Sequence, residues 1–318
     1  MFKRQIEKAY KELFGSRCDD PGYKHYFTYK DFPPMKEEAI SFISQDTNTL
    51  RGGLYYDKES IDDYDKLVIF CHGMGGGYLA YMSEINMLVK NGFLVLAYDY
   101  TGTFSSDGES LKGFTLPLLD LQYCHKFIKE NERLRNKELM IIGHSWGGFT
   151  ALNSLNMFDD ITHAVAISAP LSLKSIIREN LKILYPIFKY PILRYEAKMF
   201  GKLAYLDGMK VIKSDTKLLS VYSLDDDIVL DKYNYLPLRK KDKNKNHQEI
   251  VVKTRKHNPT HANESVPKLY DLSYRINEYI KQGKTKEEIN TLLSDVNWKE
   301  LIIQDEIIWN KIVTFLNN

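Results

Sequence analysis

The chain carries short, almost continuous runs of apolar residues, and longer segments of helical periodicity separate them. The apolar runs lie at 66–71, 93–97, 139–142, 163–167 and 218–221. Runs of this length without polar–apolar alternation indicate strands buried on both faces, as in a parallel sheet. The helical patterns lie at 79–90, 116–131 and 149–157. Strands that alternate with helices predict βαβ units and a doubly wound α/β sheet.

The start of the chain follows a different pattern. Residues 1–35 predict an N-terminal helical extension, in which a helix leads into an aromatic connector that ends at Pro33-Pro34. Two segments of strand character follow, at 38–44 and 50–56. They open the predicted α/β core, which we place at 36–170 and 214–318, with additional helices at its C-terminal end.

A long apolar segment at 171–213 interrupts the alternation of strands and helices. It is rich in Leu, Ile, Phe and Tyr, too long for a simple crossover and too apolar for a loop. We therefore expect a helical cap over the carboxyl ends of the strands. The aromatic residues expected to line a substrate pocket beneath this cap are Tyr185, Phe188, Tyr190 and Phe200.

The clearest candidate chemistry follows the apolar run at 139–142. The next residues contain the pattern G-x-S-x-G, with Ser145 at its centre, between a predicted strand and a predicted helix. In that setting the serine occupies a strained turn, and the two glycines let neighbouring backbone pass without a Cβ clash. Ser145 is the predicted nucleophile, and the amide of Trp146 is a predicted oxyanion-hole donor.

A glycine-rich loop, His72-Gly-Met-Gly-Gly-Gly, follows the run at 66–71. Acyl transfer needs a second preorganised N–H donor, and the amide of Met74 is the best candidate by position. A dinucleotide-binding fingerprint would need glycine where Tyr78 stands, although Asp99 could mimic its ribose-binding acid. A plain glycine turn is a further alternative.

Three motifs together resemble the α/β-hydrolase superfamily, and most closely its serine-aminopeptidase-like and carboxylesterase-like branch. They are the loop at 72–76, the segment 98–108 with its Tyr-Asp-Tyr-Thr-Gly start, and the pattern around Ser145. The resemblance covers 60–170 well and continues more loosely to 265. It implies an eight-stranded, mostly parallel sheet and a catalytic triad in the chain order Ser, Asp, His.

The resemblance also implies where the acid and the base lie. Family members often carry G-x-x-D-x-x-V after the strand predicted at 217–223, and this pattern selects Asp226, although Ser223 replaces the glycine. His257-Asn-Pro, soon after the strand predicted at 250–254, resembles the family's histidine loop. His261 is the alternative base, but we place it near the start of the next helix, where the helix dipole disfavours a protonated imidazole. His72 and His144 match positions that shape backbone turns in the family.

These residues imply acyl transfer. His257 takes the Ser145 proton as the hydroxyl attacks a carbonyl, and Asp226 orients the imidazole and stabilises its charge. An acyl-enzyme forms, and water then releases the acid. We therefore expect a serine hydrolase that acts on a small-molecule carboxylic ester, thioester or small amide, with no cofactor and no metal.

Three other interpretations stay open. A non-catalytic protein of this fold could bind a ligand under the cap, although it would have no use for all three triad residues. An interfacial lipase could use 183–200, which carries basic side chains, as a lid. An acyltransferase would use the same triad with a different acceptor.

Composition narrows the class of protein. A formal net charge of +2 gives no field that would favour nucleic acid or an anionic membrane as partner. Three widely spaced cysteines suggest neither a disulfide framework nor a zinc site. The N-terminus lacks the apolar core of a signal peptide, and no apolar stretch reaches the length of a membrane span. We expect a cytoplasmic enzyme, and the sequence leaves its oligomeric state open.

Overall fold

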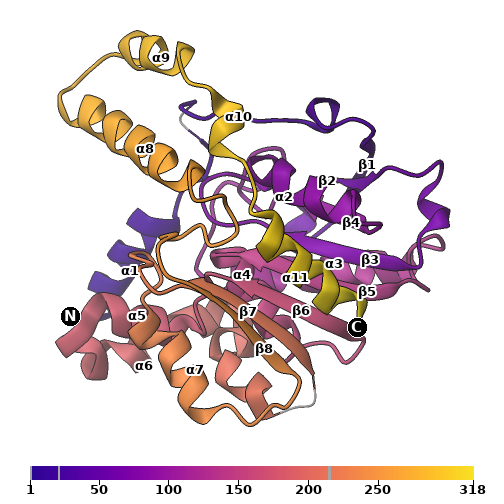
Figure 1. The fold of residues 1–318 in the computed structure, drawn as a ribbon. Coiled ribbons are helices and arrows are strands. Elements are labelled where there is room, and N and C mark those ends of the chain that lie inside the picture. Colours follow the sequence, from indigo (N-terminus) through magenta and orange to yellow (C-terminus); the bar gives the residue numbers. More distant parts are fainter. Residues whose placement is uncertain (1, 21, 214–215) are drawn as a thin grey trace.

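The computed structural model, which describes residues 2–20, 22–213 and 216–318, is built around an eight-stranded sheet (Figure 1). Its strands are β1 (Lys36–Ile43), β2 (Thr49–Tyr56), β3 (Lys66–Cys71), β4 (Leu94–Tyr98), β5 (Glu138–His144), β6 (Ile161–Ile167), β7 (Lys217–Ser223) and β8 (His247–Val252). Their order across the sheet is β1-β2-β4-β3-β5-β6-β7-β8. Neighbours from β4 to β8 run parallel, whereas β1 and β2 are antiparallel additions at one edge. The predicted mostly parallel sheet is confirmed.

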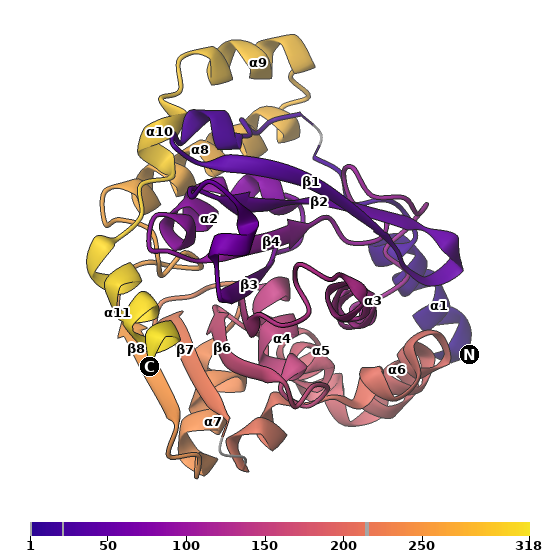
Figure 2. The ribbon, with the colours of Figure 1, turned by 90° about the vertical axis from the view of Figure 1, so that its right-hand side faces the viewer.

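Helices cover both faces of the sheet. The helices of the described residues are α1 (Phe2–Phe14), α2 (Met82–Val89), α3 (Leu116–Glu130), α4 (Trp146–Ser154), α5 (Leu173–Leu181), α6 (Tyr185–Phe200), α7 (Tyr235–Lys241), α8 (Ser265–Lys281), α9 (Lys286–Ser294), α10 (Trp298–Leu301) and α11 (Glu306–Asn317). Figure 2 shows α2 and α11 on one face, and α3 and α4 on the other. In both views α9 stands out from the body of the molecule, and Figure 1 shows α8 leading to it.

The two faces of the sheet are both apolar. Val68 and Phe70 of β3 belong to the cluster that includes α2 and α11, while Leu67 and Ile69 belong to the cluster that includes α3 and α4. Successive side chains of a strand point to opposite faces, so a strand between two helical layers needs apolar residues at every position. This is why the central strands appear in the sequence as unbroken apolar runs.

The remaining segments pack around this core. The predicted N-terminal helix is present as α1, and it lies beside α6, since the rings of Tyr10 and Tyr195 are 4.8 Å apart. The segment 171–213 is helical, as expected, and contains α5 and α6. The division into extension, core and cap stays a prediction. Its second core segment would begin at 214, which with 215 lies outside the described residues.

Two further observations concern the limits of single elements. The last strand ends at Val252, two residues before the expected Thr254, so the loop that carries His257 is longer than predicted. Among the described residues, no helix combines the length and the apolarity that crossing a bilayer requires.

Candidate active site

Ser145 occupies the turn between β5 and α4. Its φ and ψ angles are 56° and −116°, a conformation that residues with a Cβ rarely adopt. Hydrogen bonds fix the turn on both sides. The Ser145 amide donates to the Ile167 carbonyl at 2.8 Å, and the Ser145 carbonyl accepts from the Phe149 amide at 2.9 Å. The strand-to-helix elbow expected from the sequence is therefore present, with the serine at its apex.

The glycines of the pattern permit close backbone approaches around this elbow. A Cβ on Gly143 would lie 2.2 Å from the carbonyl oxygen of Gly147. A Cβ on Gly147 would lie 1.9 Å from the carbonyl oxygen of Cys71, at the end of β3. Both distances are well inside van der Waals contact, so a side chain at either position would push β5, α4 and β3 apart.

His257 and Asp226 form a hydrogen-bonded pair. Nδ1 of His257 lies 2.9 Å from Oδ2 of Asp226 and 3.1 Å from its Oδ1. Asp226 Oδ1 also accepts from the amides of Ile228 and Val229, each at 2.9 Å. Because an ionised carboxylate only accepts hydrogen bonds, Nδ1 of His257 carries the proton and Nε2 is the basic nitrogen.

The neighbouring aspartates have other partners. Nζ of Lys256 lies 3.9 Å from Asp225 Oδ2 and 3.8 Å from Asp227 Oδ2. Asp226 is buried, whereas Asp227 is exposed. Of these three carboxylates, Asp226 is the one hydrogen-bonded to His257, as counting along the sequence pattern predicts.

His261, the alternative base, belongs to a different cluster. Its Nε2 lies 3.1 Å from Oε1 of Glu84, and both side chains are buried. The expected position at a helix start is wrong, because α8 begins at Ser265 and His261 forms a β-bridge with Gln304. Among the described residues, no group of three or more His, Cys, Asp or Glu side chains is placed to hold a metal ion.

The glycine-rich loop after β3 lies directly against the elbow. A Cβ on Gly73 would be 3.4 Å from the Cβ of Ser145. The Gly73 amide is already used, since it donates to Oη of Tyr81 at 3.1 Å. Met74 follows with its side chain 46% exposed. The loop that contains Met74, the predicted second donor, therefore lies against Ser145.

Asp99 accepts hydrogen bonds that hold the end of this loop in place. Its Oδ1 accepts from the Tyr78 amide at 3.1 Å, and its Oδ2 accepts from the hydroxyl of Ser105 at 2.6 Å. The carboxylate is thus bound within the protein, where a dinucleotide site would need it free for a ribose.

Trp146 begins α4 immediately after Ser145. Its indole is buried, and Nε1 donates to the carbonyl of Phe114 at 2.7 Å, which fixes the start of the helix. The amides of the first helical turn have no partner inside the helix. The backbone N–H of Trp146 is one of these amides.

His144 joins the elbow to the loop that carries His257. Its Nε2 lies 2.7 Å from the carbonyl oxygen of His257, and its Nδ1 lies 3.0 Å from Oη of Tyr81. Burial, together with the nearby imidazole of His257, lowers the pKa of His144 to about 3. These contacts could not be predicted from sequence patterns, because they join segments more than 60 positions apart.

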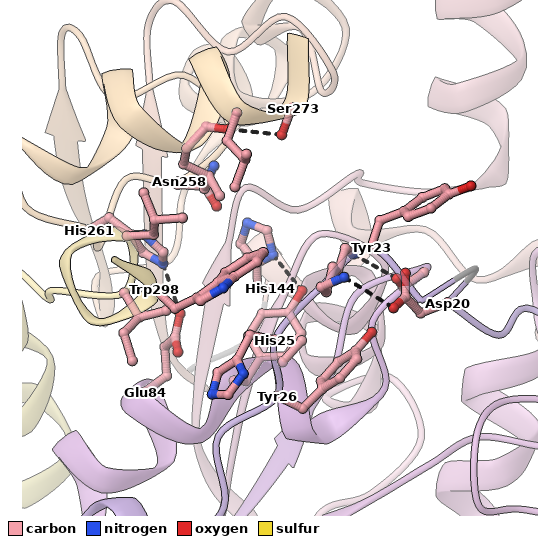
Figure 3. Close-up of a pocket in the computed structure, with 18 of the residues that line it drawn as sticks. Asp20, Tyr23, His25, Tyr26, Glu84, His144, Asn258, His261, Ser273 and Trp298 are labelled. Carbon is pink, nitrogen blue, oxygen red and sulfur yellow. Dashed lines mark hydrogen bonds and ion pairs between the residues drawn. The ribbon is translucent and has the colours of Figure 1, made fainter. Parts of the chain in front are cut away.

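A cavity of about 450 Å³ opens beside His144 (Figure 3). Parts of its wall come from Asp20 and residues 23–26 of the connector, from α8 and from α10, and sequence reasoning assigned no role to any of them. One signal was available, because Leu269, Leu272 and Ile276 recur at helical spacing.

The prediction that aromatic residues of the cap line the pocket is wrong for this cavity, since none of the residues that line it lies in 171–213. Phe200 instead packs into the core that contains Trp146. Tyr185 is partly buried against the same core, and Tyr190 is 59% exposed.

Comparison with known proteins decides the family. The sequence model of the family described as serine aminopeptidase, S33, matches residues 62–250, more than half of the 318 residues. The chain belongs to this family. As a serine aminopeptidase family member it is related to hydrolases, and the resemblance seen in its motifs is confirmed.

Bifunctional epoxide hydrolase 2 of Sus scrofa is 27% identical to it over 134 residues, 39% of this chain and 22% of that protein. The match thus spans about a fifth of that curated relative.

Solved structures give the same fold for this family member. An esterase of Pyrococcus furiosus is 22% identical, with a TM-score of 0.57 over 84% of this chain and 98% of that chain. An acetyl xylan esterase from Paenibacillus sp. R4 is 17% identical, with a TM-score of 0.55 over 87% and 92%. The α/β hydrolase GrgF from Penicillium sp. sh18 is 16% identical, with a TM-score of 0.53 over 78% and 98%. These likenesses show the α/β-hydrolase fold.

Proposed function

We propose that this chain is a serine hydrolase that cleaves a carboxylic ester, thioester or small amide through an acyl-enzyme intermediate. One observation carries the proposal. Ser145 is held at φ 56° on a strand-to-helix elbow, and His257 and Asp226, from loops far along the chain, form a buried pair at 2.9 Å. Strain of this kind persists only where surrounding structure maintains it, and it clusters at functional sites.

The first half of the reaction follows from the protonation of the pair. Nε2 of His257 accepts the Ser145 proton while Oγ attacks the carbonyl carbon of the substrate. The imidazolium that results is stabilised by Asp226, which keeps its two backbone hydrogen bonds throughout. The leaving alcohol, thiol or amine takes the proton from His257 and departs.

The developing oxyanion needs donors that are already in place. In this proposal they are the amides of Trp146, at the start of α4, and Met74, in the loop against Ser145. The α4 N-terminus adds its favourable dipole. Water then attacks the acyl-enzyme with His257 as base, and the acid leaves as Ser145 regains its proton.

An ester is the substrate to test first, because an alcohol is a better leaving group than an amine. We expect the protein to hydrolyse p-nitrophenyl acetate or butyrate, and Ser145→Ala to reduce kcat/KM by several orders of magnitude. Ser294→Ala is the matched control, since its hydroxyl lies on the exposed end of α9 and bonds to its near neighbours Thr291 and Asp295. Absence of hydrolysis across ester, thioester and anilide substrates, in a folded sample, would favour a ligand-binding protein.

A further inference from the structure

The cavity beside His144 has an apolar wall, and none of the described residues covers this wall. Leu269, Leu272, Ile276 and Ile280 recur every three or four residues, so they share one side of α8, and all of them line the cavity. Ile276 is only half-buried, and Ile280 is 47% exposed. A helix that turns its apolar side toward an open cavity gains from a bound apolar group.

The opposite side of the cavity continues this apolar character. Trp298 of α10 lies on it, with its ring stacked 5.9 Å from that of His25 in the connector. Phe70 and Ile167, from the ends of β3 and β6, form its inner surface. Polar side chains lie between these apolar surfaces, and Figure 3 shows Asp20, Glu84 and His261 among them. This composition is that of a small-molecule site with an apolar body.

The cavity lies beside segments that carry proposed catalytic residues. His144 precedes Ser145, Asn258 follows His257, and Gly75 follows Met74, and all three line the cavity. Sequence neighbours of Ser145, His257 and Met74 thus form part of the wall.

We infer that this cavity, formed by Asp20 and residues 23–26 of the connector together with α8 and α10, binds the apolar chain of an ester substrate. The inference rests on the proposed function and deepens it, because it names esters with an extended hydrocarbon chain as the substrate class. A volume of about 450 Å³ lies in the range of pockets that enclose a small organic ligand. The hydrocarbon chain of the substrate can belong to the acyl or to the alcohol part of the ester.

The test places a carboxylate on the cavity wall. Ile276→Asp introduces a charge that an apolar chain would have to desolvate, at a half-buried helix position that can tolerate it. Ile187→Asp on α6 is the matched control, since Ile187 is 54% exposed and lies outside the cavity. Both variants are assayed with p-nitrophenyl acetate, butyrate, octanoate and laurate, and with acetate esters of ethanol, octanol and dodecanol.

We expect Ile276→Asp to lower kcat/KM for the long-chain esters of one series at least tenfold and to leave the acetate within about twofold. The series affected identifies the acyl or the alcohol chain. Equal rates for wild type and Ile276→Asp on every chain length, or a loss confined to Ile187→Asp, would overturn the inference while the serine hydrolase proposal stands.

A binding measurement separates the two proposals. In Ser145→Ala, which cannot turn over, a bromine-labelled decanoic acid should quench the fluorescence of Trp298, and Ile276→Asp should weaken this binding at least tenfold. Quenching that Ile276→Asp leaves unchanged, or that persists in Trp298→Phe, would place the chain elsewhere. Binding without any esterase activity in the wild type would reject the proposed function alone.

Discussion

The backbone carbonyl oxygen of His257 accepts a hydrogen bond from Nε2 of His144, 2.7 Å away. A carbonyl cannot donate, so Nε2 carries the proton. The pKa of His144 is lowered to about 3, chiefly by burial, so the imidazole is neutral near pH 7 and its Nδ1 accepts from the hydroxyl of Tyr81. Tyr81 in turn accepts from the Gly73 amide. A single directed chain of hydrogen bonds thus joins the loop that carries Met74 to the loop that carries His257.

We predict that breaking this chain of hydrogen bonds misaligns the proposed catalytic residues and leaves the inflections of the pH–activity profile unchanged. Tyr81→Phe removes the hydroxyl and leaves Gly73 N–H and His144 Nδ1 without their partner, which costs about 1–3 kcal/mol if either stays buried. We expect kcat to fall roughly tenfold to hundredfold with a smaller change in KM. The measurement is a pH profile of kcat and kcat/KM on a hydrolysed ester.

His144→Gln is the conservative comparison, because its Nε2 amide can still donate to the His257 carbonyl. It should retain more activity than His144→Ala. Since His144 is neutral throughout the assay range, neither variant should add or remove an inflection between pH 5 and 9. Equal activity in wild type, Tyr81→Phe and His144→Ala would show that the chain does not position the base.

A second prediction separates the two histidines near the site. His257→Ala removes the partner of Asp226 and should lower kcat by roughly 10³–10⁵-fold. His261→Ala should change kcat by less than about tenfold, because His261 bonds to Glu84. It should instead lower the melting temperature, since a buried carboxylate loses its partner.

His261→Gln can restore a donor to Glu84, so it should recover part of the melting temperature. The variants are compared at temperatures where all are folded. A larger loss of kcat in His261→Ala than in His257→Ala would move the base to His261.

The third prediction concerns stability and pH at His163. This imidazole is buried on β6 beside Phe315, and burial, with Lys217 nearby, lowers its pKa from 6.5 to about 4. Between these values the unfolded chain binds more protons than the folded one. The free energy of unfolding that His163 contributes is therefore complete above about pH 6.5 and is lost as the pH falls toward 4.

Urea unfolding of wild type and His163→Gln at several pH values between 7 and 4 measures this effect. The wild-type free energy should fall more steeply with decreasing pH, by at most about 1.4 kcal/mol per pH unit for one proton. Parallel pH dependences of the two proteins would show that His163 titrates alike in the folded and unfolded chains.

The fold and the strand-to-helix elbow at Ser145 could be predicted because their signals are local. The runs that became β3 to β7 are apolar at nearly every position, since helices cover both faces of the sheet. The pattern around Ser145 is equally local, because Gly143 and Gly147 are required by contacts within the elbow and with β3. The choice of Asp226 among three neighbouring aspartates as the partner of His257 depended only on the order of residues along one loop.

The cavity and the hydrogen-bond chain could not be predicted because they depend on distant segments. Trp298 and His25 are far apart in the sequence yet stack against each other. The apolar stripe of α8 has the same spacing as a helix packed on a core, so sequence alone cannot show that it faces an open space. The role of Glu84 as partner of His261 also becomes visible only in the folded chain.

Covalent labelling by a fluorophosphonate tests the central claim most directly. The probe forms a stable adduct only with an activated serine, so intact-mass analysis and peptide mapping report both stoichiometry and position. We predict one adduct per wild-type chain, located on Ser145, no adduct in Ser145→Ala and much slower labelling in His257→Ala. Labelling that persists in a folded Ser145→Ala protein, or its absence from the folded wild type, would contradict the assignment of Ser145 as an activated nucleophile.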